Sequence, residues 1–298
     1  MGRLDGKNEN KRTELMTKVK VSWLADQLKL PLIGSDLHIE RVRPLTALAE
    51  GSLSFASSPL LAGTTPYQVA VIGPAEAAAD HITVLVSDTP RLHFALALQL
   101  LSRQVGFREE TEEARIHPSV KVGKNTFIGR GAVIGENTVI GHHVVIEDGV
   151  SIGRNCWIKS GAVIGEEGFG FERDLDGIPM HMPHLGSVRV EDDVQIGSLS
   201  TVCRGTLQDT VIERYAKIDD HVHVGHNCRI AEGAMLTAGT ILGGGSVIGR
   251  YAWLGLNAST LQKVTIGDHA YIGMGAVVIQ NVGAHQKLFG NPARVISK

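Results

Sequence analysis

The sequence predicts a mainly β protein in which a small α/β domain precedes a long parallel β-helix. The main observation is an aliphatic residue at every sixth position. Neither an α-helix, with a period of about 3.6 residues, nor a strand, with a period of about 2, explains that spacing. A small or β-branched residue also stands two positions before most of these aliphatic residues, and a glycine often follows them, where a corner needs permissive backbone angles. A six-residue repeat sustained over this length is typical of a β-helix, in which three repeats close one triangular coil.

The aliphatic positions form three runs, separated by two interruptions, and they are the expected core. Their side chains should stack inside the coils at the strand spacing of about 4.8 Å. Only Thr260 breaks the aliphatic rule in the last run. The runs are Ile116, Val122, Ile128, Ile134, Ile140, Ile146, Ile152, Ile158 and Ile164; then Val190, Ile196 and Val202; then Ile212, Ile218, Val224, Ile230, Leu236, Leu242, Ile248, Leu254, Thr260, Ile266, Ile272 and Val278.

Composition excludes several classes of protein. The 298 residues are 43% hydrophobic, with 29 basic and 31 acidic residues, and no basic run carries aromatic residues, which argues against a nucleic-acid partner. No apolar stretch is long enough to predict a membrane span. Residues 1–17 are polar and charged, so we expect a disordered leader rather than a signal peptide, and a cytoplasmic location. Cys156 and Cys228 occupy small-residue positions of the repeat, which favours packing over reactivity.

Residues 18–105 lack the repeat and predict the small α/β domain. Ser22 is placed to cap a helix over residues 23–28. β-type runs follow at residues 68–72 and 82–86, and Pro90 begins an amphipathic helix that extends to Leu101. Charged residues 108–115 then form a linker.

The β-helix is expected over residues 116–283, with a C-terminal tail over residues 284–298. Ile164 and Val190 are 26 positions apart and Val202 and Ile212 are ten apart, and neither number is a multiple of six. The first gap predicts a loop over residues 165–187. Because irregular segments on a regular scaffold tend to carry binding residues, we favour a functional loop over a tolerated surface insertion.

His226 is the strongest candidate for chemistry. It follows the inward Val224 by two positions, so it lies at a corner, and one coil further along the chain lie Gly243, Gly244 and Gly245. The glycines leave space and backbone amides above the imidazole, as an acyl donor and a developing oxyanion need. A histidine that titrates near neutrality suits a general base for an amine that attacks a thioester, and Asp219 could orient it. The alternative is a surface histidine without a catalytic role.

The repeat resembles that of the hexapeptide acyltransferases, whose fold is a left-handed parallel β-helix. Four stretches look more closely like the UDP-3-O-acylglucosamine N-acyltransferase family, which moves a 3-hydroxyacyl chain onto a glucosamine amine in lipid A synthesis. They are residues 165–171, 182–186, 204–210 and 218–227. The resemblance implies that His226 is the catalytic base, that Asp219 is its partner, and that the protein is a homotrimer with sites between neighbouring subunits.

The resemblance also implies a nucleotide-linked amino sugar as substrate. Residues 49–55 are similar to the family's uridine-binding domain, and Phe55 matches the aromatic residue that stacks on uracil. Ser58 and Leu61, however, stand where the family has Asn and Tyr, and leucine cannot donate a hydrogen bond. The expected substrate-binding residues are Phe55, Ser58, Phe169, Phe171, His184 and Asn227.

The acyl donor is expected to be a thioester carried by acyl carrier protein or by coenzyme A. Lys263 stands where the family has a second active-site histidine, and Cys203 replaces an aspartate. The family's C-terminal helical extension is missing, and residues 290–294 instead resemble the ending of coenzyme-A-dependent acetyltransferases. The expected donor-binding residues are Gly243, Gly244, Gly245, Lys263, Asn291 and Arg294.

Three alternatives remain open. The first is an acetyl-CoA-dependent nucleotide-sugar N-acetyltransferase outside lipid A synthesis. The second is a zinc protein resembling β-helical carbonic anhydrases, because His221 and His226 are five positions apart and His184 or a neighbouring subunit could supply a third ligand. The third is a non-catalytic scaffold. We expect no metal and no bound cofactor.

Overall fold

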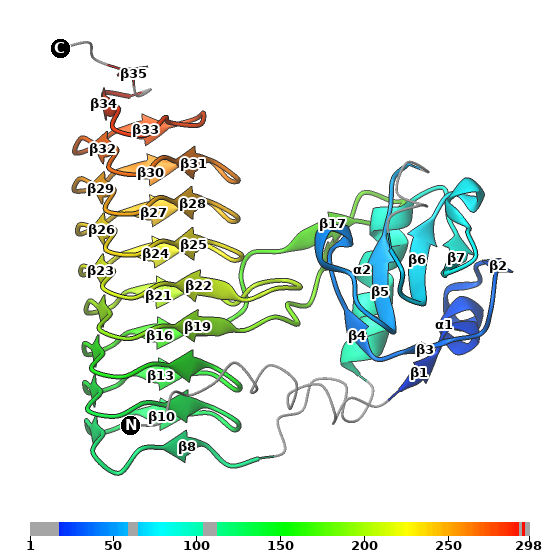
Figure 1. Ribbon diagram of the computed structural model, residues 1–298, viewed down its shortest axis with the longest axis horizontal. Helices are drawn as coiled ribbons and strands as arrows, with labels where there is room; N and C mark the ends of the chain where they lie inside the picture. The colour runs from blue at the N-terminus through cyan, green and yellow to red at the C-terminus, as the bar shows by residue number, and fades with distance from the viewer. Residues whose placement is uncertain (1–17, 59–64, 104–111, 292–293, 296–298) are drawn as a thin grey trace. The chain divides into compact units, whose positions relative to one another are not determined.

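The computed structural model describes residues 18–58, 65–103, 112–291 and 294–295. The chain divides into two compact units (Figure 1). One comprises Met1–Glu109 and Gly170–Leu185, and the other comprises Glu110–Phe169 and Gly186–Lys298. The leader expected over residues 1–17, most of the expected linker and Leu61 lie outside the described residues. Within the described part of the chain, no helix combines the length and the apolar character needed to cross a membrane.

The smaller unit is built on a sheet with the strand order β2-β7-β6-β5-β4. Strands β4 to β7 pair in parallel, and β2 pairs antiparallel with β7 at one edge. The β-type runs predicted at residues 68–72 and 82–86 correspond to β6 and β7, so both predictions are confirmed. The strands are β1 (Val19–Lys20), β2 (Leu32–Ile33), β3 (His38–Ile39), β4 (Arg41–Val42), β5 (Ser52–Phe55), β6 (Val69–Gly73) and β7 (Ile82–Val86).

The described residues of this unit form two α-helices and two short 3-10 helices, η2 (Leu45–Ala47) and η4 (Ala75–Ala77). The predicted helix after Pro90 is α2 (Pro90–Ser102), which begins at that proline and buries Phe94 and Leu98. The first helix is α1 (Val21–Leu28), and the prediction that Ser22 caps it was wrong. The cap residue is Lys20, and Ser22 lies inside the first turn. Its hydroxyl donates to Asp36 at 3.0 Å, a partner that is distant in sequence and that the local pattern therefore does not reveal.

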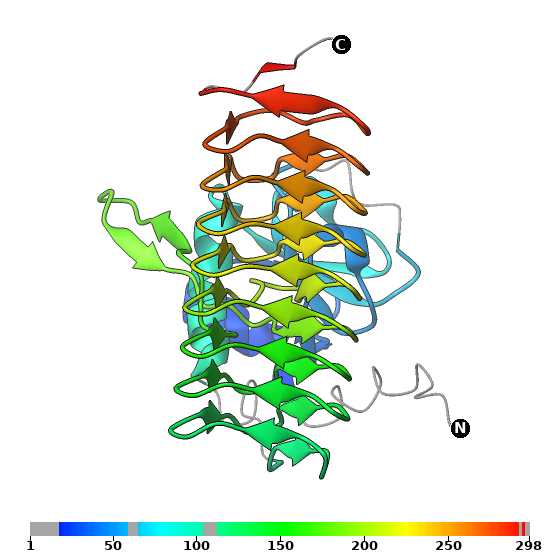
Figure 2. The same cartoon turned by 90° about the vertical axis from the view of Figure 1, so that its left-hand side faces the viewer.

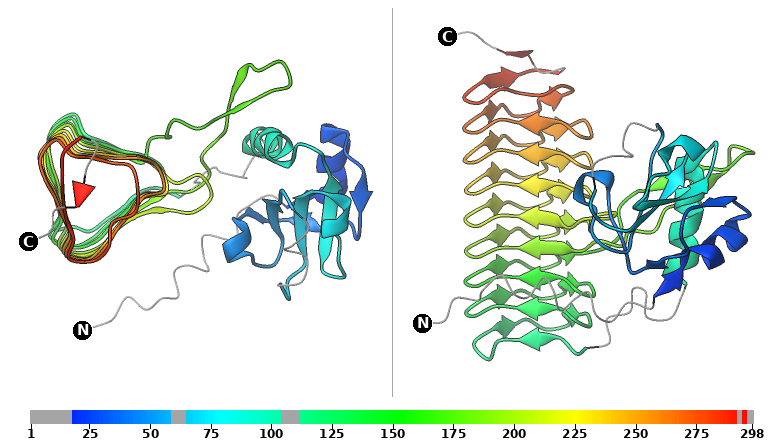
Figure 3. Two further views of the ribbon diagram at one scale, coloured as in Figure 1. Left: turned by 90° about the horizontal axis from the view of Figure 1, so that it is seen from above. Right: turned by 45° about the vertical axis from the view of Figure 1, so that its right-hand side comes forward.

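The larger unit is a left-handed parallel β-helix, as predicted. Figure 2 shows the coils stacked as a ladder, and Figure 3 (left) shows their triangular outline along the axis. One face contains β10 (Phe127–Ile128), β13 (Val145–Ile146), β16 (Val163–Ile164), β21 (Thr201–Val202), β24 (His223–Val224), β27 (Ile241–Leu242), β30 (Ser259–Thr260) and β33 (Val277–Val278).

The other two faces have the same construction. The second contains β8 (Arg115–Ile116), β11 (Val133–Ile134), β14 (Ser151–Ile152), β19 (Val188–Val190), β22 (Thr210–Ile212), β25 (Arg229–Ile230), β28 (Val247–Ile248) and β31 (Thr265–Ile266). The third contains β9 (Lys121–Val122), β12 (Val139–Ile140), β15 (Trp157–Ile158), β20 (Gln195–Ile196), β23 (Lys217–Ile218), β26 (Met235–Leu236), β29 (Trp253–Leu254), β32 (Tyr271–Ile272), β34 (Lys287–Phe289) and β35 (Arg294–Val295).

The aliphatic repeat forms the core of this unit. Residues 18 positions apart pair across coils, as Ile134 does with Ile152, and both side chains are 2% exposed. Ile116 and Val122 were also predicted to be core residues, but they are 41% and 46% exposed. They belong to the first coil, which no described coil covers on its outer side.

Both interruptions leave the coil register intact. Ile152 pairs with Val190, 38 positions later, so the first excursion adds 20 residues to an 18-residue coil. Val190 pairs with Ile212, 22 positions later, so the second adds four. The first excursion contains an antiparallel hairpin of β17 (Phe171–Arg173) and β18 (Pro179–His181). The parallel ladder continues to β34, inside the segment expected to be a tail.

Candidate active site

One corner position of the repeat has a recurrent structural role in this β-helix. The residue two places after the inward aliphatic side chain accepts a hydrogen bond from a backbone N–H of the preceding coil. Asp220 accepts from Ser198 at 2.7 Å, and Asp268 accepts from Arg250 at 2.8 Å. His142 has the same role, because its Nδ1 accepts the N–H of Lys124 at 2.8 Å. Since a backbone N–H can only donate, neutral His142 carries its hydrogen on Nε2.

His226 occupies the same corner position but makes different contacts. The corresponding N–H, that of Arg204, donates instead to the carbonyl of Glu166 at 2.9 Å. Nδ1 of His226 lies 2.9 Å from Oδ1 of Asn227, an oxygen that also accepts the backbone N–H of Thr206 at 3.1 Å. An oxygen acceptor requires the hydrogen of neutral His226 to be on Nδ1. Nε2 is therefore the nitrogen that can take a proton.

The glycine patch lies one coil further along, as predicted. A Cβ atom at Gly244 would lie 2.6 Å from Nε2 of His226, so the absence of a side chain there leaves room beside this nitrogen. The N–H of Gly245 donates to the carbonyl of His226 at 2.7 Å, and that of Gly243 donates to Thr260. The N–H of Gly244 has no acceptor among the described residues. The patch therefore offers one available amide where the sequence suggested several.

Thr260, the exception in the aliphatic repeat, supports this patch from inside the coil. Its Oγ1 accepts the N–H of Gly243 at 3.2 Å and lies 3.0 Å from Oγ of Ser246. That serine hydroxyl also lies 2.7 Å from the carbonyl of Gly243, to which it can donate. A leucine or isoleucine would lose both of these contacts, which accounts for a hydroxyl at this position.

Asp219 and His226 follow consecutive strands of one coil. Asp219 follows β23, and His226 follows β24, so they stand at the two corners that bound the face containing β24. The backbone carbonyl of Asp219 links two adjacent coils, because it accepts a hydrogen bond from the hydroxyl of Ser200 at 2.7 Å. The neighbouring Asp220 has a pKa below the usual range, first because the Ser198 N–H donates to it and then because Lys159 lies 3.1 Å away. The pairing of Asp219 with His226 stays a prediction.

The other histidines of this segment do not complete a metal site within one subunit. Nδ1 of His223 lies 2.7 Å from the hydroxyl of Thr201, and burial, followed by the charge of His226, lowers its pKa. His221 is exposed and has the left-handed backbone conformation of a corner, with φ of 57°. In the described residues, His221, His223 and His226 belong to no group of three side chains able to hold one ion.

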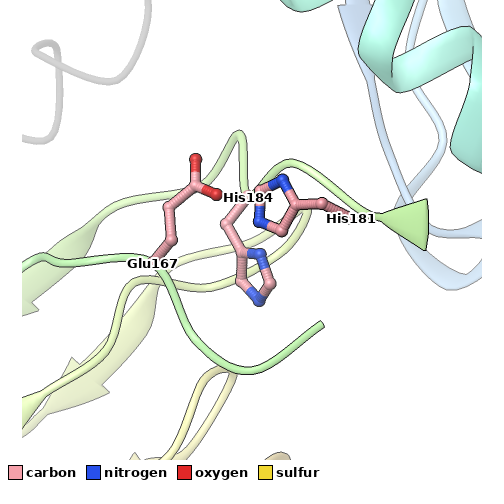
Figure 4. Close-up of side chains that lie close together, drawn as sticks. All are labelled: Glu167, His181 and His184. Atoms are coloured by element: carbon pink, nitrogen blue, oxygen red, sulfur yellow. The ribbon is translucent and has the colours of Figure 1, made fainter. Parts of the chain in front are cut away.

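The first excursion contains three of the residues predicted to bind ligands or metal. Phe169 is 90% exposed and Phe171 42% exposed, and the ring of Phe171 meets that of His181 edge-on at 5.7 Å. His184 is fully buried, its Nδ1 lies 3.0 Å from the carbonyl of Met182, and its ring packs against Gly170. Figure 4 shows the side chains of Glu167, His181 and His184, which all belong to this excursion. Substrate binding by these residues stays a prediction.

The second excursion is anchored to both ends of the first. Arg204 is buried, and its Nε donates to the carbonyl of Gly165. Asp209 accepts the N–H of Ser187 at 2.9 Å. Neither Arg204 nor Thr206 was predicted to be a site residue, although both lie in the family-like stretch 204–210 and in the ten-residue gap between Val202 and Ile212. Cys203 lies beside Arg204, and burial, together with the charge of Glu166, raises its pKa.

Of the remaining predicted site residues, Phe55 and Ser58 belong to the smaller unit and Lys263 belongs to the larger one. Phe55 ends β5, is half-buried, and packs against Phe94 of α2 with ring centroids 4.8 Å apart. Ser58 follows it and is partly exposed. Lys263 lies one coil beyond the glycine patch, where its N–H donates to the carbonyl of Gly244 at 2.9 Å.

Two of the predicted donor-binding residues lie at the C-terminal end of the β-helix. Asn291 is exposed in the turn after β34, and Arg294 begins β35. His226 follows β24, and β27, β30 and β33 are stacked beyond it on that face. The residues predicted to bind the donor therefore extend from the glycine patch beside His226 to the C-terminal end of the β-helix.

Comparisons with known proteins agree with this architecture. Residues 131–166 match the model of the bacterial transferase hexapeptide family, and residues 246–280 match that of the hexapeptide repeat of succinyl-transferase. The solved UDP-N-acetylglucosamine acyltransferase from Campylobacter jejuni has a similar fold. The TM-score is 0.50 at 20% identity, over 62% of this chain and 73% of that one.

Curated relatives extend the similarity to nearly the whole chain. The UDP-3-O-acylglucosamine N-acyltransferase of Herminiimonas arsenicoxydans is 30% identical over 297 residues, 87% of this chain and 84% of that protein. The enzyme of the same name from Campylobacter lari is 32% identical over 92% of this chain and 93% of its own length. With this identity and coverage, the chain is an acyltransferase that belongs to the UDP-3-O-acylglucosamine N-acyltransferase family.

Proposed function

We propose that this protein transfers an acyl chain from a thioester to the amine of a UDP-linked 3-O-acylglucosamine, as a step of lipid A synthesis. The names of its relatives indicate the substrate class. The observation that carries the proposal is the orientation of His226. Asn227 binds Nδ1, and Nε2 faces the space beside Gly244.

His226 is the proposed general base. The substrate amine attacks the carbonyl carbon of the thioester and loses a proton to Nε2, so that a C–N bond forms. The tetrahedral intermediate then collapses, the C–S bond breaks, and the imidazolium returns the proton to the departing thiolate. The N–H of Gly244 is the amide available to stabilise the developing oxyanion. Neither a metal ion nor a bound cofactor is needed for these steps.

The active form is proposed to be a homotrimer in the cytoplasm. Asp219 and His226 bound the same face of the β-helix at opposite corners. A neighbouring subunit that packs against this face would bring its own Asp219 toward His226 of the first. Asp219 then orients the imidazole and stabilises its charged form from across the subunit boundary.

The test is a substrate panel. Purified protein is given UDP-3-O-acylglucosamine or other UDP- and dTDP-linked amino sugars, with 3-hydroxyacyl carrier protein or acetyl-CoA, and products are identified by mass spectrometry. We expect an amide on UDP-3-O-acylglucosamine with the carrier protein as donor. Turnover restricted to acetyl-CoA and another amino sugar would refute the lipid A assignment and favour a nucleotide-sugar N-acetyltransferase. No amide with any pair would refute acyl transfer to amino sugars.

A further inference from the structure

Thr206, in the four-residue excursion, makes two hydrogen bonds to one atom. Its backbone N–H donates to Oδ1 of Asn227 at 3.1 Å, and its hydroxyl donates to the same oxygen at 3.0 Å. The other end of that amide, Nδ2, lies 3.5 Å from the carbonyl of Gln208. Both ends of the Asn227 side chain therefore face the same short excursion, and each meets a group of the correct polarity.

A rotated Asn227 amide would be unfavourable. The NH2 group would then face the N–H of Thr206, so that two donors would oppose each other, and the oxygen would face the carbonyl of Gln208. The Thr206 N–H would lose its acceptor, and the hydroxyl would have to reverse from donor to acceptor, so both groups favour the observed orientation and removal of the hydroxyl weakens that preference. Thr206 therefore selects the rotamer that presents oxygen to His226.

The rotamer of Asn227 decides which nitrogen of His226 is basic. With oxygen toward Nδ1 at 2.9 Å, the hydrogen stays on Nδ1, and Nε2 can accept a proton beside Gly244. With the NH2 group toward Nδ1, that nitrogen would become the acceptor, and the hydrogen would move to Nε2. His142 shows this second tautomer in the same fold, because its Nδ1 accepts a backbone N–H.

Contacts outside the site hold Thr206 in place. The preceding Gly205 donates its N–H to the carbonyl of Ser187 at 3.2 Å, and its carbonyl accepts the N–H of Gly186 at 3.0 Å. A Cβ atom at Gly205 would overlap the carbonyl of Gln208, so the turn requires glycine there. Thr206 thus approaches Asn227 from a backbone that is itself fixed.

We infer that Thr206 is a positioning residue that, through Asn227, holds His226 in the tautomer whose Nε2 is the base. The inference deepens the proposed function and rests on it for its catalytic consequence. The tautomer of His226 that it specifies does not depend on the identity of the substrate.

The experiment compares Thr206→Val, which lacks the hydroxyl, with Thr206→Ser, which retains it. Histidine labelled with ¹⁵N reports the tautomer by NMR, the His226 signal is assigned by its loss in His226→Ala, and His142 serves as the internal example of the other tautomer. We expect Thr206→Val to move part of His226 to the Nε2–H form, with kcat lower by about 3- to 10-fold and KM nearly unchanged. Thr206→Ser should retain the wild-type spectrum and rate.

A double variant separates positioning from simple structural support. In Asn227→Asp both side-chain oxygens accept, so rotation no longer changes the group that meets His226. Adding Thr206→Val to Asn227→Asp should then have little effect on the tautomer. Thr126→Val, which removes a 2.8 Å hydroxyl hydrogen bond to Gly141 in a coil without site residues, is the matched control and should leave His226 unchanged.

Two outcomes would overturn the inference. One is an unchanged His226 spectrum in Thr206→Val. The other is an equal effect of Thr206→Val with and without Asn227→Asp, which would indicate general support of the fold. Failure of the proposed function has a different signature: the wild-type protein would form no amide, whereas the NMR comparison would still report the tautomer.

Discussion

At the residue scale, one corner position of the repeat is occupied by two histidines with different hydrogen bonds. His142 and His226 each stand two places after an inward aliphatic side chain, yet the hydrogen of the neutral ring lies on opposite nitrogens. The difference arises because the backbone N–H of Arg204, which would otherwise donate to His226, donates to the carbonyl of Glu166. Substituting each histidine by alanine therefore distinguishes an effect on folding from an effect on catalysis.

We predict that His226→Ala folds normally but loses at least about 10²-fold in kcat, since a general base contributes this much or more. His142→Ala is the matched control and should keep its kcat, while losing the corner hydrogen bond to Lys124. Steady-state kinetics measure the first effect, and circular dichroism verifies folding. Wild-type turnover in His226→Ala would end the proposal that it is the base.

Gly244 tests the space beside Nε2. Its φ is not in the left-handed range, so alanine is allowed by the backbone, but the added Cβ would lie 2.6 Å from Nε2. We expect Gly244→Ala to lower kcat/KM by about 10-fold or more, because the approach to the base is blocked. Gly283→Ala, where the nearest atoms belong to the flexible side chain of Gln286, is the control. Equal activities of the two variants would show that the space is not used.

The three cysteines should be unreactive in the folded protein. Burial raises the pKa of Cys156 to about 11 and that of Cys228 to about 12, and it also raises the pKa of Cys203. At pH 8 the thiolate fractions of the first two are then on the order of 10⁻³ and 10⁻⁴. Iodoacetamide followed by mass spectrometry should modify none of the three in native buffer and all three in urea. Rapid labelling of native Cys228 would contradict its place in the core.

At the scale of the element, the coil is a three-stranded turn closed by short polar contacts at its corners. Asp220 illustrates the type, since its carboxylate accepts the Ser198 N–H and pairs with Lys159. A carboxylate with a depressed pKa in the folded state stabilises the protein above the pKa of the unfolded state. That contribution disappears as the pH falls through the folded-state value.

We therefore expect Asp220→Asn to be less stable than wild type at pH 7, and the difference to shrink as the pH falls below about 4. The side chain is partly exposed, so solvent screening limits the effect to at most about 1 kcal/mol. Urea denaturation at pH 7 and about pH 3 measures it. Glu136→Gln is the control, because the carboxylate of Glu136 acts on Arg154 through its charge. A difference that grows on acidification would contradict the assignment.

Regular elements could be predicted from the sequence because their signals are local. The six-residue spacing predicted the β-helix, and Pro90 predicted the start of α2, since each pattern is contained in a few consecutive residues. Ser22 shows the limit: its partner Asp36 lies 14 positions away, so the cap prediction was wrong. Ile116 and Val122 show another limit, because the pattern contains no information about the first coil having an open side.

The candidate site was predictable only in part. The 18-residue coil length placed Gly244 beside His226 correctly, because both lie in regular register. Thr206 could not be found in this way, since it contacts Asn227 only because an excursion brings it back across 21 positions. Arg204 likewise binds Gly165 across 39 positions. The sequence periodicity does not predict such contacts, because they depend on the path of an irregular segment outside the repeat.

At the scale of the whole molecule, the proposed site needs more than one copy of the chain. Light scattering should give three times the 31.9 kDa of a single chain. Ile241 is 52% exposed on the face between the corners of Asp219 and His226, so Ile241→Glu should dissociate the trimer. Met235→Glu, on another face and 39% exposed, is the control. A monomeric wild-type protein with full activity would refute the subunit-boundary site.

Trimers assembled from two different variants test the subunit-boundary site without dissociating the trimer. We expect trimers that combine Asp219→Asn chains with His226→Ala chains to regain activity, because some boundaries then join an intact Asp219 to an intact His226. If both residues act within one chain, every site in the mixture is defective and no activity returns. Differently tagged chains, co-expressed and purified through both tags, provide the mixed species for the kinetic assay.

The end of the β-helix has a consequence for solubility. The last coil of a parallel β-helix has backbone N–H and C=O groups without a neighbouring strand. The first coil of another copy could pair with these groups, and repeated pairing of this kind would produce a fibre. Here β35 pairs antiparallel with β34, and the N–H of Val277 donates to the carbonyl of Gly290. The reversed strand direction presents a mismatched template to an incoming parallel coil. We therefore expect this antiparallel strand pair to disfavour end-to-end polymerisation.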